Sequence, residues 1–151
     1  MNIRVQEDWA VDGIGYAPTE YDFVGGHIEC LRLYFQGCLH KCEHCANPHA
    51  QLVNGGVKTD TEKIKKCIAD SGFKKIIFTG GEPFLQPAAA LDIAQFAHSK
   101  GMTVVCITGY SKKQIAEWHD NRKLLAKEID DLVTRCIFQL NDWEVADNAG
   151  N

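Results

Sequence analysis

Three cysteines gather in the segment GCLHKCEHCANP, which spans residues 37–48. Cys38, Cys42 and Cys45 follow the spacing C-x3-C-x2-C, and no fourth cysteine lies close by. Thiolates are the usual ligands of iron–sulfur clusters, and three of them can hold three corners of a cubane cluster. The fourth iron then stays open to a small molecule, as the open position of a catalytic zinc does. The segment therefore predicts a metal site with one coordination position left for a ligand.

Zinc is an alternative interpretation of the same segment. A structural site of three cysteines and one histidine would take its fourth ligand from His40, His44 or His49. The motif HIE at residues 27–29, followed by the second and third cysteines, also resembles the H-x-E and P-C-x-x-C pattern of zinc deaminases. A lysine stands where that pattern has proline. Free cysteines explain poorly why three of them lie so close together.

The composition is that of an ordinary globular protein, with 45% hydrophobic and 24% charged residues. A length of 151 residues suits one domain, and we expect residues 1–151 to form it. The net charge of −4 disfavours a nucleic-acid binder, which needs clustered lysines and arginines. The sequence has no apolar run of membrane-spanning length and no signal-peptide core, so we expect a cytoplasmic protein that does not bind membranes. In that compartment, an odd count of seven cysteines favours metal or redox chemistry over disulfides.

The elements that must position the cysteines alternate between β-rich and helical patterns, which predicts βα units around a parallel sheet. The expected strands lie in LRLYFQ (residues 31–36), KKIIFTGGEP, MTVVCITGY and DLVTRCIFQL. Helices are expected at residues 59–72, 87–101, 111–118 and 124–129. Residues 1–30 are rich in glycine and are expected to be mostly loop around short strands.

Two capping boxes are expected at helix starts. Thr59 and Glu62 have the spacing for the first helix, and Ser111 and Gln114 have it for the third. Gly72 is the expected stop of the first helix.

Three of the predicted strands lead directly into segments that can hold a ligand. These are the cysteine segment, the turn GGEP at residues 80–83 and the turn TGY at residues 108–110. Because parallel strands end at one edge of a sheet, we expect the three segments to lie side by side. Gly80 and Gly81 lack a Cβ and let the backbone approach a ligand, and Glu82 can face a positively charged amino group. A strand-to-helix turn that merely needs glycine is the alternative interpretation.

The cysteine spacing, together with TGGEP at residues 79–83, resembles the radical S-adenosylmethionine superfamily. Within it, the chain looks most like the activating proteins of anaerobic ribonucleoside-triphosphate reductase. This likeness rests on the small size, on FQGC and CANP at the two ends of the cysteine motif, and on TGY, over residues 31–110. The resemblance implies an α/β fold of an abbreviated, open partial (β/α) barrel. The chain is too short for eight βα units, which take about 250 residues.

The resemblance also implies the cofactors and the reaction. Cys38, Cys42 and Cys45 would ligate three irons of a 4Fe-4S cluster, and S-adenosyl-L-methionine would bind the fourth. Reductive cleavage would yield a 5′-deoxyadenosyl radical that takes a hydrogen atom from a glycine of anaerobic ribonucleotide reductase, a large glycyl-radical protein. A flavodoxin-like protein is the expected electron donor. Such an activator needs no acid, base or nucleophile of its own, so no catalytic side chain is expected.

The turn after the second strand is where the family contacts the methionine end of the cofactor. Gly80, Gly81, Glu82 and Pro83 are therefore expected to bind S-adenosylmethionine.

Three further residues are candidates for the rest of the cofactor pocket. His44 stands just before the third cluster cysteine, where many members of the family carry an aromatic residue that lies against adenine. Thr108 and Tyr110 are expected to line the pocket, with capping and rim packing as alternative roles.

The remaining cysteines and histidines have plainer expectations. His40 and His49 flank the cluster motif and are candidates to tune it by hydrogen bonds, whereas His98 and His119 suit polar surface positions. Buried thiols are expected at Cys67, Cys106 and Cys136. Cys30 begins the first strand and is expected in the core, with an approach to the site as its alternative role.

Two rival functions stay open. One is a radical S-adenosylmethionine enzyme that acts on a small molecule or a peptide, for instance a 7-deazaguanine-forming synthase. The other is a zinc-stabilised interaction module without catalysis.

Overall fold

The computed structural model describes residues 1–6, 14–22, 26–40 and 51–134. In these segments seven strands form one mixed sheet, in the order β4-β1-β3-β5-β6-β7, with β2 paired to β3 off this path. The strands are β1 (Asn2–Val5), β2 (Ile14–Asp22), β3 (Gly26–Phe35), β4 (Val57–Asp60), β5 (Lys75–Gly80), β6 (Thr103–Thr108) and β7 (Asp131–Thr134). The helices are α1 (Thr61–Ser71), the short 3-10 helix η2 (Pro83–Leu85), α2 (Pro87–Ser99), α3 (Lys112–Ala116) and α4 (Asn121–Glu128).

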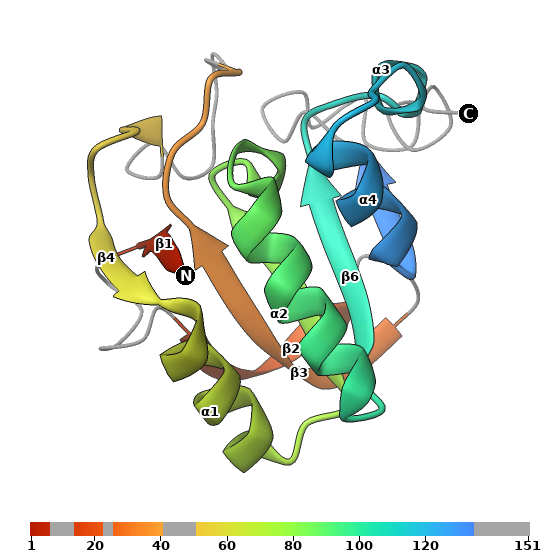
Figure 1. Cartoon of the computed structure of the whole chain (residues 1–151). Helices are drawn as coiled ribbons and strands as arrows, with labels where there is room; N and C mark the ends of the chain where they lie inside the picture. The colour runs from red at the N-terminus through yellow and green to blue at the C-terminus, as the bar shows by residue number, and fades with distance from the viewer. Residues whose placement is uncertain (7–13, 23–25, 41–50, 135–151) are drawn as a thin grey trace.

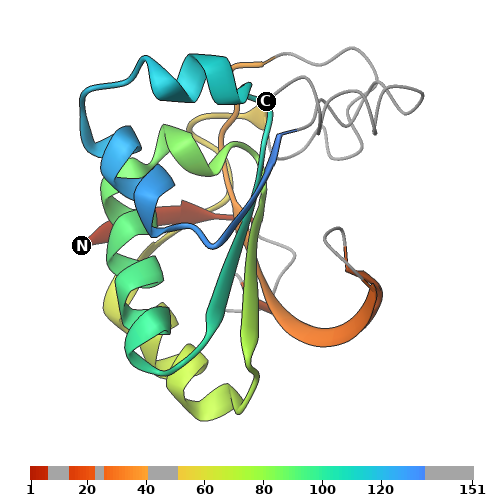
Figure 2. The ribbon, with the colours of Figure 1, turned by 90° about the vertical axis from the view of Figure 1, so that its right-hand side faces the viewer.

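Four neighbouring strands, β3, β5, β6 and β7, are parallel to one another. They correspond to the four strands expected from the sequence, and the described sheet is open, as an abbreviated barrel requires. Helices α1, α2 and α4 all lie on one side of this sheet, whereas the hairpin of β2 and β3 curls toward the other side (Figures 1 and 2). The expectation of an open partial (β/α) barrel is confirmed.

The two faces of the sheet carry separate apolar clusters. Alternate residues such as Leu33 of β3 and Phe78 of β5 pack against the helices in the larger cluster. Their neighbours turn to the opposite face, where a smaller buried cluster includes Cys30, Ile77 and Val105. This alternation follows from the two-residue period of a strand, and near-continuous apolar runs are typical of strands covered on both faces.

The start of α1 differs from the expected capping box of Thr59 and Glu62. Asp60 is the cap, and its Oδ1 accepts a hydrogen bond from the backbone N–H of Glu62 at 2.9 Å. Thr59 is part of β4, where it pairs with Ile3 of β1, so it is held in the sheet and the helix begins after Asp60. The predicted stop at Gly72 is confirmed, with φ of 72°.

The second capping box is confirmed at α3. The Ser111 hydroxyl accepts from the Gln114 N–H at 3.1 Å, and the Gln114 side chain accepts from the Ser111 N–H at 2.8 Å. Helix α2 begins at Pro87, as expected, and is followed by Gly101 with φ of 75°.

The expectation for residues 1–30 is wrong in part. β2 is nine residues long and pairs antiparallel with β3, which begins at Gly26 rather than at residue 31. β2 pairs on one side with β3 and is otherwise an edge among the described strands, and an edge strand tolerates the proline at position 18. The expected fourth strand is present as β7, while its predicted continuation beyond residue 134, with Cys136, lies outside the described residues. None of the described helices is long and apolar enough to cross a membrane.

His98 ties the end of α2 to α4 and to the start of β7. Its Nδ1 lies 2.7 Å from Oε1 of Glu128, and its Nε2 lies 2.7 Å from Oδ2 of Asp130. Hydrogen bonds to Asp130 and then to Glu128 raise the pKa of His98 above its ordinary value, because both ring nitrogens donate only when the imidazole is protonated.

We predict that this cluster makes folding stability depend on pH. A raised folded-state pKa means that the contribution is complete below about pH 6.5, the unfolded value, and is lost as the pH rises through the folded pKa. Because the His98 side chain is partly exposed, we expect the unfolding free energy to fall by at most about 1 kcal/mol as the pH rises through this range. Urea unfolding of wild type and His98→Gln at pH 6 and pH 9 measures it. The exposed His119 supplies the control His119→Gln, and equal pH dependence in all three proteins would contradict the assignment.

Candidate functional site

The cysteine segment leaves the sheet just after β3. Gly37 has φ of 102°, and the Cys38 N–H donates to the Gln51 carbonyl at 3.2 Å. The segment therefore departs from and returns to the same point of the sheet edge. Cys38 lies at this point with a partly exposed side chain.

Several predicted site residues lie outside the described residues: Cys42, Cys45, His44 and His49. Their predicted roles stay predictions. In the described part of the chain, no group of three or more histidine, cysteine, aspartate or glutamate side chains is arranged to hold a metal ion.

Backbone hydrogen bonds join the GGEP turn to the base of the cysteine segment. The Gly81 N–H donates to the Phe35 carbonyl at 2.7 Å, and the Glu82 N–H donates to the Gly37 carbonyl at 2.8 Å. The two segments predicted to hold the metal and the methionine are thus in direct contact.

Gly80 is needed for this contact. It has φ of 93°, and a Cβ built there would lie 2.6 Å from the Phe35 carbonyl oxygen. We expected both glycines of the turn to allow the approach of a ligand, whereas the Gly80 backbone packs against β3 and leaves no room for a side chain.

The Glu82 side chain is buried, with 1% of its surface exposed, and faces the protein interior. Its Oε2 accepts from the Phe84 N–H at 2.9 Å, which caps η2. Its Oε1 accepts from the Gly109 N–H at 2.9 Å, and the Thr108 hydroxyl lies within 2.9 Å of both oxygens. His40 completes the set, with Nε2 at 2.7 Å from Oε1. Donors from all three predicted segments therefore meet at one carboxylate, and the expectation that these segments lie side by side is confirmed.

The TGY turn contributes one buried and one partly exposed side chain. The Thr108 hydroxyl donates to Glu82 and also accepts from the Tyr110 N–H at 3.1 Å, which stabilises the turn after β6. Burial, and then the negative charge of Glu82, raise the pKa of Tyr110, so its phenol stays protonated at neutral pH. Tyr110 packs edge-on against His40 and Trp118, with ring centroids 4.5 and 4.9 Å apart.

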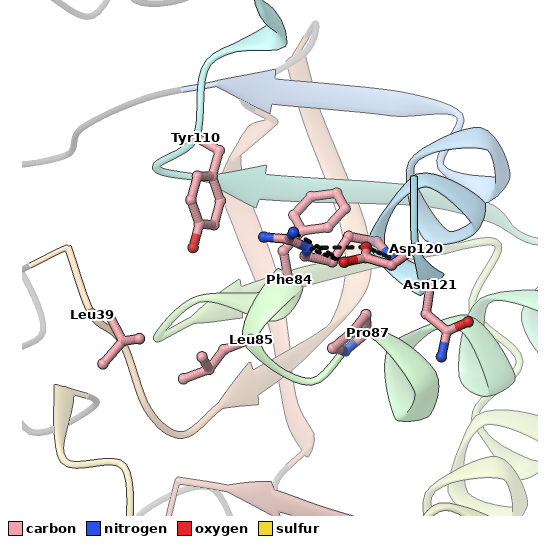
Figure 3. A pocket seen from close by; sticks show the side chains of 8 residues that line it. Leu39, Phe84, Leu85, Pro87, Tyr110, Asp120 and Asn121 are labelled. Atoms are coloured by element: carbon pink, nitrogen blue, oxygen red, sulfur yellow. Dashed lines mark hydrogen bonds and ion pairs between the residues drawn. The ribbon is translucent and has the colours of Figure 1, made fainter. Parts of the chain in front are cut away.

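A pocket of about 540 Å³ opens beside the cysteine segment (Figure 3). Its lining residues are Leu39, Phe84, Leu85, Pro87, Tyr110, Asp120, Asn121 and Arg122. The volume is in the range of small-molecule sites, and the walls are mostly apolar with an Arg122–Asp120 ion pair at 3.0 Å on one side. Tyr110 lines this pocket, whereas Thr108 is buried and is not among the lining residues. The contact of either residue with the cofactor stays a prediction.

The other described cysteines lie in or against the apolar clusters. Cys30 and Cys106 are fully buried, as expected, whereas Cys67 is only partly buried and packs against the core. Burial, with the nearby negative charge of Glu82, raises the pKa of Cys106 well above its usual value. That thiol is therefore a poor metal ligand, in contrast to the partly exposed Cys38.

Sequence reasoning missed the central role of His40 and the pocket residues of α4. His40 was a candidate for tuning the cluster, but the sequence carries no signal for its bond to Glu82, which is 42 residues away.

A family model described as a 4Fe-4S single cluster domain matches residues 24–142. The chain belongs to this family. The match covers the cysteine segment, both turns and β7, and it supports an iron–sulfur cluster rather than zinc as the metal. The sulfur of Cys38 and the C-x3-C-x2-C spacing fit that cluster by donor chemistry.

Relatives among known proteins place the chain in the radical S-adenosylmethionine superfamily. It is 30% identical to the pyruvate formate-lyase-activating enzyme of Clostridium pasteurianum, over 70% of this chain and 48% of that protein. It is 31% identical to a protein of Methanocaldococcus jannaschii predicted to be a glycyl-radical enzyme activating enzyme, over 62% of this chain and 38% of that protein. The chain thus spans about half or less of the length of these relatives.

The fold has a counterpart among solved structures. The crystal structure of QueE from Escherichia coli matches 72% of this chain and 53% of that chain, with a TM-score of 0.56 and 16% identity. At that identity the likeness shows the fold.

Substitution of Gly80 tests the packing of the turn against β3. Gly72→Ala is the matched control, because its φ is 72° but no atom lies within 4 Å of the added Cβ. We expect Gly72→Ala to cost about 1–2 kcal/mol of unfolding free energy for the left-handed conformation. Gly80→Ala should cost clearly more, because the backbone of Phe35 must also move. Urea unfolding measures both, and equal losses would contradict the packing argument.

Proposed function

We propose that the protein is a glycyl-radical activating enzyme of the radical S-adenosylmethionine superfamily, with anaerobic ribonucleotide reductase as its partner. The observation that carries the proposal is the contact between the base of the cysteine segment and the GGEP turn. Hydrogen bonds from Gly81 to Phe35 and from Glu82 to Gly37 hold the two segments at one edge of the sheet. A cluster on the first segment and a ligand on the second would be neighbours.

Cys38, Cys42 and Cys45 are the proposed ligands of three irons of the 4Fe-4S cluster. A bound and reduced cluster would supply one electron for cleavage of the carbon–sulfur bond of S-adenosylmethionine, which would give methionine and a 5′-deoxyadenosyl radical. That radical would take one hydrogen atom from a glycine of the partner and leave 5′-deoxyadenosine and a glycyl radical. The electron comes from an external donor, which we take to be a flavodoxin-like protein.

The carboxylate of Glu82 already accepts hydrogen bonds from donors of the protein, so we do not assign it to the cofactor. We assign recognition of the methionine ammonium to backbone carbonyls of the turn formed by Gly80, Gly81, Glu82 and Pro83. The Glu82 carboxylate keeps that backbone in place.

For the adenosine end, the mostly apolar pocket beside Tyr110 supports the proposed contact of that residue. His44 is proposed to lie against adenine on the strength of its position before Cys45.

A large glycyl-radical protein as the kind of partner is supported by the two relatives named for activating enzymes and by the unclosed sheet. The choice of anaerobic ribonucleotide reductase rests on the sequence resemblance at FQGC, CANP and TGY. Among the described residues, the helices cover one face of the sheet, and the four parallel strands do not close a barrel around a substrate. A sheet that does not close into a barrel suits a loop of a large protein better than a small molecule that needs enclosure. We propose that the reaction takes place in the cytoplasm.

Anoxic reconstitution with iron and sulfide tests the proposal. We expect a brown protein with about four irons and four sulfides per chain. Addition of S-adenosylmethionine and a strong reductant should yield 5′-deoxyadenosine, and addition of the reductase should yield an electron paramagnetic resonance signal of a glycyl radical. Cys38→Ala should lose cluster and product, whereas Cys106→Ala, at a buried thiol, should keep both.

Other outcomes would redirect the assignment. Cleavage of S-adenosylmethionine with turnover of a small substrate, and no radical on the reductase, would indicate the rival class of small-molecule enzymes. A colourless protein that holds one zinc would overturn the cluster and the proposed function together.

A further inference from the structure

The Glu82 carboxylate is a junction of three segments. It accepts from the Phe84 N–H of its own turn, from Thr108 at the end of β6 and Gly109 just after it, and from His40 in the cysteine segment, at 2.7–2.9 Å. Two carboxylate oxygens accept about four hydrogen bonds, so these donors saturate the group. Because a carboxylate only accepts, Nε2 of His40 is the donor in their contact.

The His40 ring occupies space that a side chain at position 109 would otherwise fill. A Cβ built on Gly109 would lie 2.7 Å from Cδ2 and 2.8 Å from Nε2 of His40. The other side of the ring meets Tyr110 edge-on, at 4.5 Å between centroids. The absence of a side chain at position 109 and the aromatic residue at position 110 thus shape a slot for this histidine, which retains 18% side-chain exposure.

The hydrogen bond between His40 and Glu82 affects the cysteine segment because of where His40 stands in the sequence. It stands two residues after Cys38 and two before Cys42, in the middle of the C-x3-C spacing. The base of the segment is fixed by the backbone bond between Gly37 and Glu82, and His40 adds a second attachment farther along.

We propose that His40 is a positioning residue that locks the cysteine segment onto Glu82, so that the cluster and the S-adenosylmethionine-binding turn keep one mutual geometry. The identity of the ligand in this statement rests on the proposed function, whereas the lock itself rests on the contacts of His40. Glu82 is accordingly the anchor of the three segments, and its side chain is not the group that meets the ammonium.

The first experiment separates the hydrogen bond from the ring. His40→Phe keeps a ring against Tyr110 and removes the donor, whereas His40→Gln restores an N–H donor. After anoxic reconstitution, we compare the rate at which a chelator removes iron and the affinity for S-adenosylmethionine, read from its effect on the spectrum of the reduced cluster. We expect iron loss about ten-fold faster and binding about ten-fold weaker in His40→Phe, as one hydrogen bond to a charged group allows. In His40→Gln, the rate of iron loss and the affinity for S-adenosylmethionine should lie within about three-fold of the wild-type values. The control His119→Phe, at an exposed position, should have the wild-type values.

The second experiment approaches the slot from Gly109, in case His40→Phe does not fold. Gly109→Ala should push the His40 ring from Glu82 and speed iron loss in the same way. In a His40→Ala background, Gly109→Ala should not change the rate of iron loss further, because the ring that the added Cβ would meet is absent.

Two outcomes would overturn the proposal: His40→Phe with wild-type iron loss and binding, or additive effects of the Gly109 and His40 changes. A wild-type protein that holds its cluster but does not cleave S-adenosylmethionine would sink the proposed function alone. The chelator comparison would still test the lock in that case.

Discussion

Donors from three strand ends converge on the buried carboxylate of Glu82. An ionised carboxylate removed from water is costly unless hydrogen bonds replace its hydration, so the native state keeps these donors in place together. Displacement of one segment would remove hydrogen bonds from the buried carboxylate of Glu82, and the positions of the other two segments would then be less stable. The cysteine segment, the GGEP turn and the TGY turn therefore behave as one unit at the edge of the sheet.

The parallel strands beneath this unit explain why the three segments meet. β3, β5 and β6 are hydrogen-bonded neighbours, so their carboxyl ends lie about one strand spacing apart. Helices on one face bury the larger apolar cluster, which makes the strand ends a rigid base for the site. The opposite face of the described sheet carries the smaller buried cluster, and the β2–β3 hairpin curls toward that side.

Predictions of helix caps were correct where the hydrogen bonds involved join residues close together in the sequence. The capping box of Ser111 and Gln114 is present because its bonds join residues three apart. The equivalent prediction at Thr59 was wrong because Thr59 pairs with Ile3 inside the sheet, and Asp60, the last residue of β4, is the residue that directly precedes the helix and caps it. The β2–β3 hairpin was missed for a related reason. Its glycines and proline are typical of loops, but pairing with a long partner strand outweighs those preferences.

The amino-acid sequence by itself determined the strand-to-turn alternation, the thiolate spacing and the glycines at positive φ, because each depends on residues that are neighbours along the chain. It also determined that three strands would end beside one another, since this follows from parallel βα topology. The tertiary structure alone decided that His40 meets Glu82 and that Gly109 makes room for it. Those contacts join residues 42 and 69 positions apart, and no local propensity or periodicity specifies which side chains will meet once the sheet has formed.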